Sequence, residues 1–210
     1  MRGSGGSAAG ESGVKPPHSK DAAHRYSTAR GGIPMANWPH SPPHRLFEPG
    51  TFMITGATVH KQLFFRSPER LSFLHALLLD ELQAAGWRPQ AWAVFPNHYH
   101  VVAMAPESPD GLRQRLSKIH THSAAQINRE DGQAGRQVWF QFWDSAITFH
   151  RSYFARLRYV HENPVHHGVV ARAADYEWGS AGWLEQRADP AYRNLLETFK
   201  IDQLQIQDAY

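Results

Sequence analysis

Residues 91–105, AWAVFPNHYHVVAMA, hold the pattern that decides the fold. Two short apolar stretches, Ala91–Phe95 and His98–Ala105, flank the dipeptide Pro96-Asn97, which is typical of a turn. The segment therefore predicts two consecutive strands joined by a short connection.

Further strands and helices are predicted on either side of this pair of strands. A strand and then a helix precede it, and a helix and then a strand follow it. The predicted elements are a strand at 51–59, a helix at 67–85, a helix at 109–128, a strand at 138–147 and a further helix at 152–163. With the two middle strands added, the order is strand, helix, strand, strand, helix, strand. This is the split βαβ order of an α+β ferredoxin-like fold. We expect an antiparallel sheet with helices on one face, followed by a C-terminal helical extension.

The composition of the 210 residues excludes several classes of site and suggests how the chain is divided. With no cysteine, the chain has no disulfide scaffold, no cysteine-ligated zinc and no thiol nucleophile. Residues 1–45 hold seven Gly and six Pro and few large apolar side chains, so we predict a disordered tail. Residues 46–185 then form the domain and 186–210 an extension. No apolar run approaches the ~18 residues of a membrane span, and the first residues lack the apolar core of a secretory signal. We expect a cytoplasmic, nucleoid-associated bacterial protein.

Basic residues are concentrated in one part of the chain. The total of 22 Lys and Arg against 19 Asp and Glu is nearly balanced, but residues 113–172 hold nine basic and four acidic residues. Such a band favours a polyanionic partner. We expect DNA-backbone contacts from Arg113, Lys118, Arg156 and Arg158.

The first candidate site is the His-x-His pair at the start of the strand 98–105. Side chains alternate along a strand, so His98 and His100 share one face and Tyr99 points to the other. Two imidazoles about 7 Å apart at their Cα atoms are able to bind one metal ion. Two edge histidines with ordinary hydrogen bonds are the alternative.

The second candidate site is the sequence Tyr159-Val160-His161-Glu162-Asn163 in the last predicted helix. At about 100° per residue, Tyr159 and Asn163 lie one turn apart, on the side away from the apolar stripe that begins at Phe154. We therefore expect both side chains on the face turned away from the core.

Together these residues suggest phosphodiester chemistry. A tyrosyl oxygen attacks phosphorus only when the phosphodiester is polarised and its charge is neutralised, which a divalent ion achieves. His98, His100 and the Asn163 amide oxygen form a mixed ligand set that suits Mg²⁺ or Mn²⁺ and does not exclude Zn²⁺. The nucleophile is then Tyr159.

Four short motifs resemble a known family. They are Phe95-Pro96-Asn97-His98-Tyr99-His100, Trp143-Asp144, Tyr159-Val160-His161-Glu162-Asn163-Pro164-Val165 and Tyr176-Glu177-Trp178-Gly179-Ser180. Their order and spacing resemble the REP-associated tyrosine transposases, which are single-tyrosine HUH endonucleases. The similarity runs from about Pro49 to the C-terminus. Gly179 stands where the family commonly has Ser, and the tail before Arg45 has no counterpart.

The resemblance implies a ferredoxin-like fold in which His98 and His100 bind a divalent ion and Asn163 supplies a third ligand. It also implies that Tyr159 cuts single-stranded DNA and forms a 5′-phosphotyrosine. We therefore expect a metal-dependent endonuclease and strand-transferase that acts at hairpin-forming repeats, as a monomer or homodimer with no membrane partner. A catalytically silent hairpin-binding protein, such as a domesticated repressor, is the alternative, and a plain ferredoxin-like RNA binder ranks third.

Other patterns have simpler interpretations. His161-Glu162 is followed by His166 rather than by a histidine at position 165, so the zinc-protease motif is absent. Residues 139–143, WFQFW, are predicted to form a buried strand, with base stacking as the less favoured alternative. We expect His120 and His122 to be solvated, and we assign 166–168, HHG, to the end of the helix with no ligand role.

Overall fold

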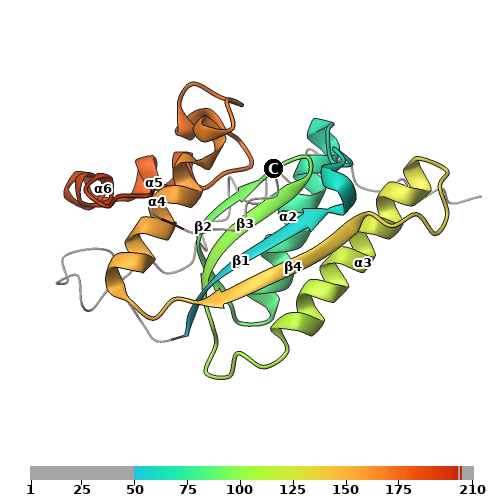
Figure 1. The fold of residues 1–210 in the computed structure, drawn as a ribbon, viewed down its shortest axis with the longest axis horizontal. Helices are drawn as coiled ribbons and strands as arrows, with labels where there is room; N and C mark the ends of the chain where they lie inside the picture. Colours follow the sequence, from blue (N-terminus) through green and yellow to red (C-terminus); the bar gives the residue numbers. More distant parts are fainter. Residues whose placement is uncertain (1–49, 203, 205–210) are drawn as a thin grey trace, which may run out of the picture.

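The computed structural model of the chain describes residues 50–202 and 204, and a four-stranded antiparallel sheet lies at its centre. The order across the sheet is β2-β3-β1-β4 (Figure 1). The strands are β1 Thr51–Thr58, β2 Arg88–Val94, β3 His98–Met104 and β4 Trp139–Ala146. This order, with the two central strands contributed by the two halves of the split βαβ unit, confirms the predicted ferredoxin-like α+β fold.

The helices lie close to their predicted positions as far as the fourth strand. They are α2 Pro68–Ala84, α3 Leu112–Glu130, α4 His150–His166, α5 Ala181–Arg187 and α6 Pro190–Glu197, with short 3-10 turns η2 Val59–Lys61 and η3 Ala173–Asp175. Ser67 caps α2, because its hydroxyl accepts a hydrogen bond from the Arg70 N–H at 3.3 Å. Pro68 follows at the first helical position, where its missing N–H costs nothing.

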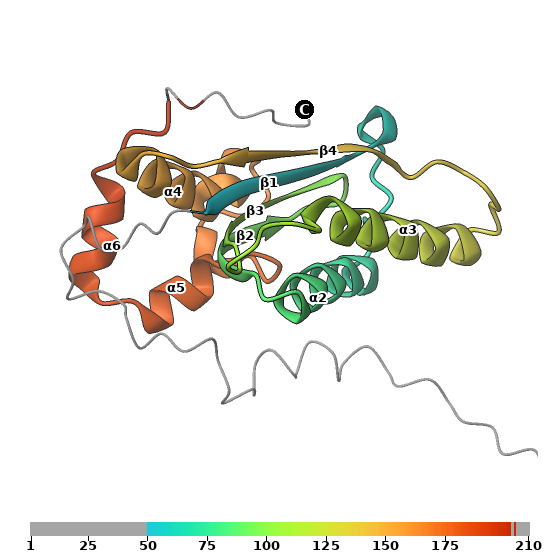
Figure 2. The ribbon, with the colours of Figure 1, turned by 90° about the horizontal axis from the view of Figure 1, so that it is seen from below.

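Two helices cover one face of the sheet, as the sequence predicts (Figure 2). Leucines of α2 and α3, such as Leu78 and Leu116, are fully buried against Ile54 and Val101 of the sheet. The apolar stripe of each helix is thus buried in this contact, which forms the larger core.

A second helical layer lies on the other face. There α4 packs mainly on β2 and β3, and α5 and α6 continue beside it (Figures 1 and 2). Phe154 of α4 is buried in one cluster with Val102 of β3 and with Tyr192 and Leu196 of α6. Helix α6 of the predicted extension is therefore part of this second core.

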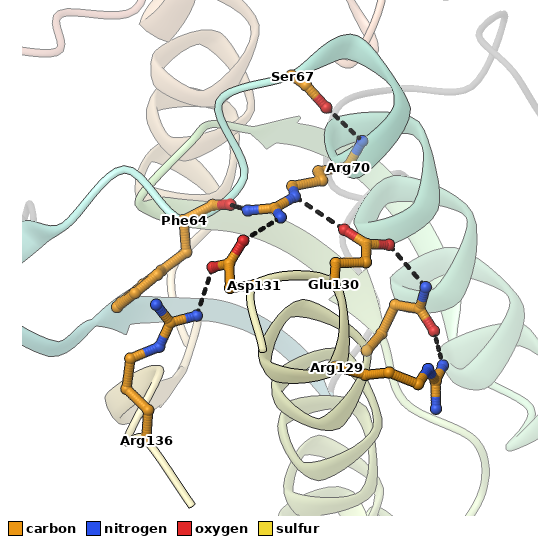
Figure 3. Close-up of polar contacts among 8 residues, drawn as sticks. Phe64, Ser67, Arg70, Arg129, Glu130, Asp131 and Arg136 are labelled. Carbon is orange, nitrogen blue, oxygen red and sulfur yellow. Dashed lines mark hydrogen bonds and ion pairs between the residues drawn. The ribbon is translucent and has the colours of Figure 1, made fainter. Parts of the chain in front are cut away.

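Charged side chains tie the start of α2 to the end of α3 (Figure 3). The Arg70 guanidinium contacts Glu130 at 2.9 Å and Asp131, and also donates to the Phe64 carbonyl at 3.1 Å. Arg136 binds the other oxygen of Asp131 at 2.6 Å. These two arginines, Arg70 foremost, lower the pKa of the Asp131 carboxyl below its usual range.

The last long helix differs from its predicted extent. We predicted 152–163, whereas α4 begins at His150 and continues through Pro164 to His166. Pro164 has no N–H to donate, but the helical hydrogen bonds continue after it. The His167 N–H donates to the Asn163 carbonyl at 3.0 Å. Helix α4 therefore ends one turn later than a proline boundary suggests.

Two predictions about exposure are wrong. His120 is not solvated: its ring stacks on Trp139 at 4.1 Å between centroids and bonds the Tyr99 hydroxyl at 2.9 Å. Strand β4 is not buried as a whole, because it lies at the edge of the sheet and only Trp139 in it is inaccessible. His122 is exposed as expected.

The tail that we predicted to be disordered, residues 1–45, lies outside the described residues. Within the described part of the chain, no helix is both long and apolar enough to cross a membrane.

Candidate active site between β3 and α4

The two histidines of β3 share one face of the sheet, as the alternation predicts. The His98 and His100 ring centroids lie 5.1 Å apart, and both side chains are buried. Tyr99 points to the opposite face, where its ring lies so close to Gly56 of β1 that a Cβ there would come within 2.4 Å. Only glycine leaves room for this ring beside β3.

Hydrogen bonds orient both imidazoles. The Asn97 amide oxygen lies 2.7 Å from His98 Nδ1, and the Thr55 hydroxyl lies 2.8 Å from His100 Nδ1. A proton held at Nδ1 leaves the lone pair on Nε2, the usual arrangement of a metal-binding histidine. His98 Nε2 is buried and makes no hydrogen bond to the described residues.

Helix α4 places Tyr159 and Asn163 over this pair. The Tyr159 ring stands edge-on to His100, with 5.6 Å between the ring centroids. Asn163 lies one turn further along α4 and is fully buried, and within the described residues its amide makes no hydrogen bond of standard geometry, although it lies close enough to His98 to act on the pKa of that ring. The four residues that the sequence singled out are thus brought to one place.

The prediction that Tyr159 and Asn163 face away from the core is wrong. Helix α4 is covered on two sides, by the sheet and by α5 and α6, so it has two buried stripes. Phe154 packs towards α6, where it stacks on Phe199, and Tyr159 packs towards β3. The helical wheel separates the two stripes correctly but does not show that both are buried.

The site keeps His98 neutral. Burial is the main cause that lowers the pKa of His98, to about 2, and the neighbouring His100 and His167 rings lower it further. The Asn163 amide acts weakly in the opposite direction. A neutral imidazole is the form that binds a metal ion, so no proton has to be displaced at neutral pH.

One neighbour of the pair was missed. His167, just after α4, lies against His98 with 5.0 Å between ring centroids and against Phe95 with 4.7 Å. It follows Asn163 by four residues, which is the helical spacing that brings it to the same side. Among the described residues, no group of three His, Cys, Asp or Glu side chains is arranged to hold a metal, so the candidate ligands remain two imidazoles and an amide.

The four basic residues expected to contact DNA do not form one surface. Arg113 and Lys118 are on α3 and the other two are on α4, on opposite faces of the sheet (Figure 2). Lys118 pairs with Glu81 at 2.7 Å, and Arg113 lies over the Phe142 ring at 5.6 Å.

On α4 the two arginines differ in their partners. Arg158 binds Glu162 at 2.8 Å and two carbonyl groups near the end of α6. Arg156 donates to the Ser152 hydroxyl and has no carboxylate partner among the described residues.

Comparisons with known proteins find similarity to members of the family that the motifs suggest. Over 94 residues the chain is 30% identical to the REP-associated tyrosine transposase of Escherichia coli, covering 43% of this chain and 52% of that protein. Over 99 residues it is 26% identical to a putative REP-associated tyrosine transposase of Haemophilus influenzae, covering 43% of this chain and 56% of that one. The chain thus spans about half the length of the curated relatives that it matches.

These matches confirm the resemblance to the REP-associated tyrosine transposases. A solved structure of a REP-associated tyrosine transposase bound to a REP hairpin has the same fold, with a TM-score of 0.54 and 20% identity over 78% of this chain and 90% of that one. No family model matches the chain.

Proposed function

We propose that this protein is a metal-dependent endonuclease and strand-transferase that cuts single-stranded DNA at hairpin-forming repeats, with Tyr159 as the nucleophile. The observation that carries the proposal is the position of the Tyr159 ring, 5.6 Å from His100 and one helical turn from Asn163. A phenol held beside a pair of imidazoles and one turn from an amide is the arrangement that a metal-assisted tyrosine nucleophile requires.

The residues present fit a divalent ion. His98 Nε2 and the Asn163 amide oxygen are buried without a hydrogen bond of standard geometry to the described residues, and a bound ion would occupy the lone pairs of both atoms. His98, His100 and Asn163 would hold Mg²⁺ or Mn²⁺ and leave positions for phosphate oxygens. When bound, the ion supplies charge neutralisation at the phosphate.

The chain itself supplies the nucleophile. In the proposed step the Tyr159 oxygen forms a bond to phosphorus and the bond from phosphorus to the DNA 3′ oxygen breaks. The phenol loses its proton, the 3′ oxygen leaves as a hydroxyl, and the 5′ phosphate stays on Tyr159. Because one phosphodiester replaces another, a second DNA 3′ hydroxyl is able to reverse the step without a nucleotide cofactor.

The relatives support hairpin DNA as the substrate class. The solved neighbour is bound to a REP hairpin, and both curated relatives are named as REP-associated transposases. Arg156, three residues before Tyr159 and without a carboxylate partner in the described chain, offers a cation for the DNA backbone beside the site.

A covalent-adduct assay tests the proposal. We expect an end-labelled imperfect hairpin with single-stranded extensions, incubated with the protein and Mn²⁺, to give a protein–DNA band that survives denaturation. The Tyr159→Phe variant should give no band, because it lacks the attacking oxygen. Tyr153→Phe, on the same helix, is the matched control and should keep it.

Two outcomes contradict the proposal in different ways. A wild-type protein that binds the hairpin tightly and forms no band is the silent hairpin-binding protein. A Tyr159→Phe variant that keeps the band shows that another residue is the nucleophile.

A further inference from the structure

We propose that Phe140 and Trp143 of β4 form a stacking surface for the unpaired bases of the DNA that flank the phosphate at Tyr159. The inference rests on the proposed function, since it names where the single-stranded part of that substrate lies. It concerns a part of the sheet that neither the His pair nor α4 occupies.

Strand register connects β4 to the candidate active site. Thr55 of β1 pairs with His100 of β3 on one side and with Trp143 of β4 on the other. Residues paired across antiparallel strands point to the same face, and the hydrogen bond of 2.8 Å between Thr55 and His100 confirms the face for the first pair. Since neighbouring strands are about 4.8 Å apart, the Trp143 backbone lies roughly 10 Å from that of His100.

A bulge in β4 adds Phe140 to the same side. In a regular strand, residues three apart point to opposite faces, yet the Phe140 and Trp143 rings lie only 6.3 Å apart between centroids. The register shifts between Ala57 and Thr58, which pair with Gln141 and Trp139 and leave Phe140 as the additional residue. Bulges of this kind redirect a side chain at the edge of a sheet.

This side of β4 is accessible. Helix α4 packs mainly on β2 and β3, the other half of the sheet (Figure 1). Phe140 is 57% exposed, Trp143 is partly exposed, and Gln141 and Ser145 are exposed as well. Adjacent aromatic rings that an edge strand leaves accessible to solvent form a candidate binding surface.

Charge favours nucleic acid as the occupant. Arg156 lies on α4 three residues before Tyr159, and its half-buried guanidinium has no carboxylate within the described residues. Stacking aromatic rings beside a cation is the combination with which proteins bind single strands, rings for the bases and the cation for the phosphates. A second copy of the chain, paired along the free edge of β4, would need neither feature.

The experiment compares two DNA probes. A fluorescein-labelled imperfect hairpin carries single-stranded extensions on both strands, and a blunt hairpin has the same stem. We expect Phe140→Ala and Trp143→Ala each to weaken binding of the extended hairpin roughly tenfold, measured by fluorescence anisotropy, and to leave the blunt hairpin unchanged. Trp143→Phe should retain most of the affinity because a ring remains.

Phe149→Ala is the matched control. Phe149 is 74% exposed and precedes α4, beyond the far end of β4, so its loss should not change either affinity. Circular dichroism melting checks that each variant is folded. If Trp143→Ala unfolds, the Phe140→Ala variant still tests the inference, because Phe140 is exposed.

The outcomes separate this inference from the proposed function. A wild-type protein that binds neither probe and forms no adduct contradicts the proposed function itself. Normal adduct formation together with equal binding by Phe140→Ala, Trp143→Ala and wild type overturns the stacking surface alone. A change of oligomeric state in size-exclusion chromatography, with DNA affinity unchanged, assigns the surface to a protein contact and also overturns it.

Discussion

Asn163 is the residue whose surroundings most favour the proposed function of the site over a purely structural role. It is fully buried on α4 and its amide atoms make no hydrogen bond within the described chain. Burying such a group without partners costs about 1–3 kcal/mol, which a leucine of similar size would avoid. A bound ion coordinated by the Asn163 amide oxygen and by His98 Nε2 would remove the part of this cost that comes from these two acceptors.

The metal site gives a prediction about these residues. By isothermal titration calorimetry with Mn²⁺, we expect the double variant His98→Ala/His100→Ala to lose measurable binding, because both nitrogen ligands are gone. Asn163→Ala should bind roughly tenfold more weakly, since water is able to replace one oxygen ligand. His122→Ala, at an exposed histidine of α3, should bind as wild type. Wild-type affinity in the double variant would place the metal elsewhere.

At the scale of elements, Arg158 joins α4 to the end of α6. Its guanidinium donates to the carbonyl groups of Glu197 and Phe199, each at 2.7 Å, in addition to its ion pair with Glu162. These contacts give Arg158 a structural role that its position in a basic segment of the sequence does not reveal.

A stability measurement distinguishes the two roles of Arg158. We expect Arg158→Ala to lower the free energy of unfolding by about 1–3 kcal/mol in urea, because two carbonyl groups and a carboxylate lose a charged donor. Arg151→Ala, an exposed position on the same helix, should change it by less than about 0.5 kcal/mol. If Arg158→Ala is as stable as wild type but binds hairpin DNA more weakly, the backbone contact predicted from sequence is correct.

The elements also show what the sequence can and cannot predict. Local patterns are sufficient for the order of strands and helices and for the shared face of His98 and His100, since both depend on periodicity alone. Strand order is not local: β4 lies at the edge because β1 pairs with one of its sides and no other strand of the described residues pairs with the other, so the exposure of Phe140 was not predictable. The burial of Tyr159 depends in the same way on β3, which lies against α4 although it is distant in the sequence.

At the scale of the whole molecule, two histidines packed between the sheet and the helices α2 and α3 couple folding to pH. Burial lowers the pKa of His75 to about 4 and that of His120 to about 3. His75 lies beside Trp92 of β2, and His120 is enclosed by Tyr99, Trp139 and Phe142, so both belong to the layer between the sheet and α2 and α3. Protonation of either ring is therefore opposed by the packing of this core.

The direction of the pH dependence follows from the lowered pKa values. In the unfolded chain these histidines titrate near pH 6.5, so below that pH the unfolded state binds more protons than the folded state and stability decreases. Their contribution is fully present above about pH 6.5. Between pH 6.5 and pH 5 each histidine should cost about 2 kcal/mol of stability.

Urea unfolding at pH 7.5 and pH 5 measures this loss. The His120→Gln variant should be less stable than wild type at pH 7.5, because it lacks the stacked ring, yet should lose about 2 kcal/mol less on acidification, because one shifted group has been removed. His122→Gln, at an exposed histidine two residues along α3 from His120, should keep the wild-type dependence. The same loss in His120→Gln as in wild type would mean that His120 becomes protonated in the folded protein, and that the layer under α3 opens to water before the molecule unfolds.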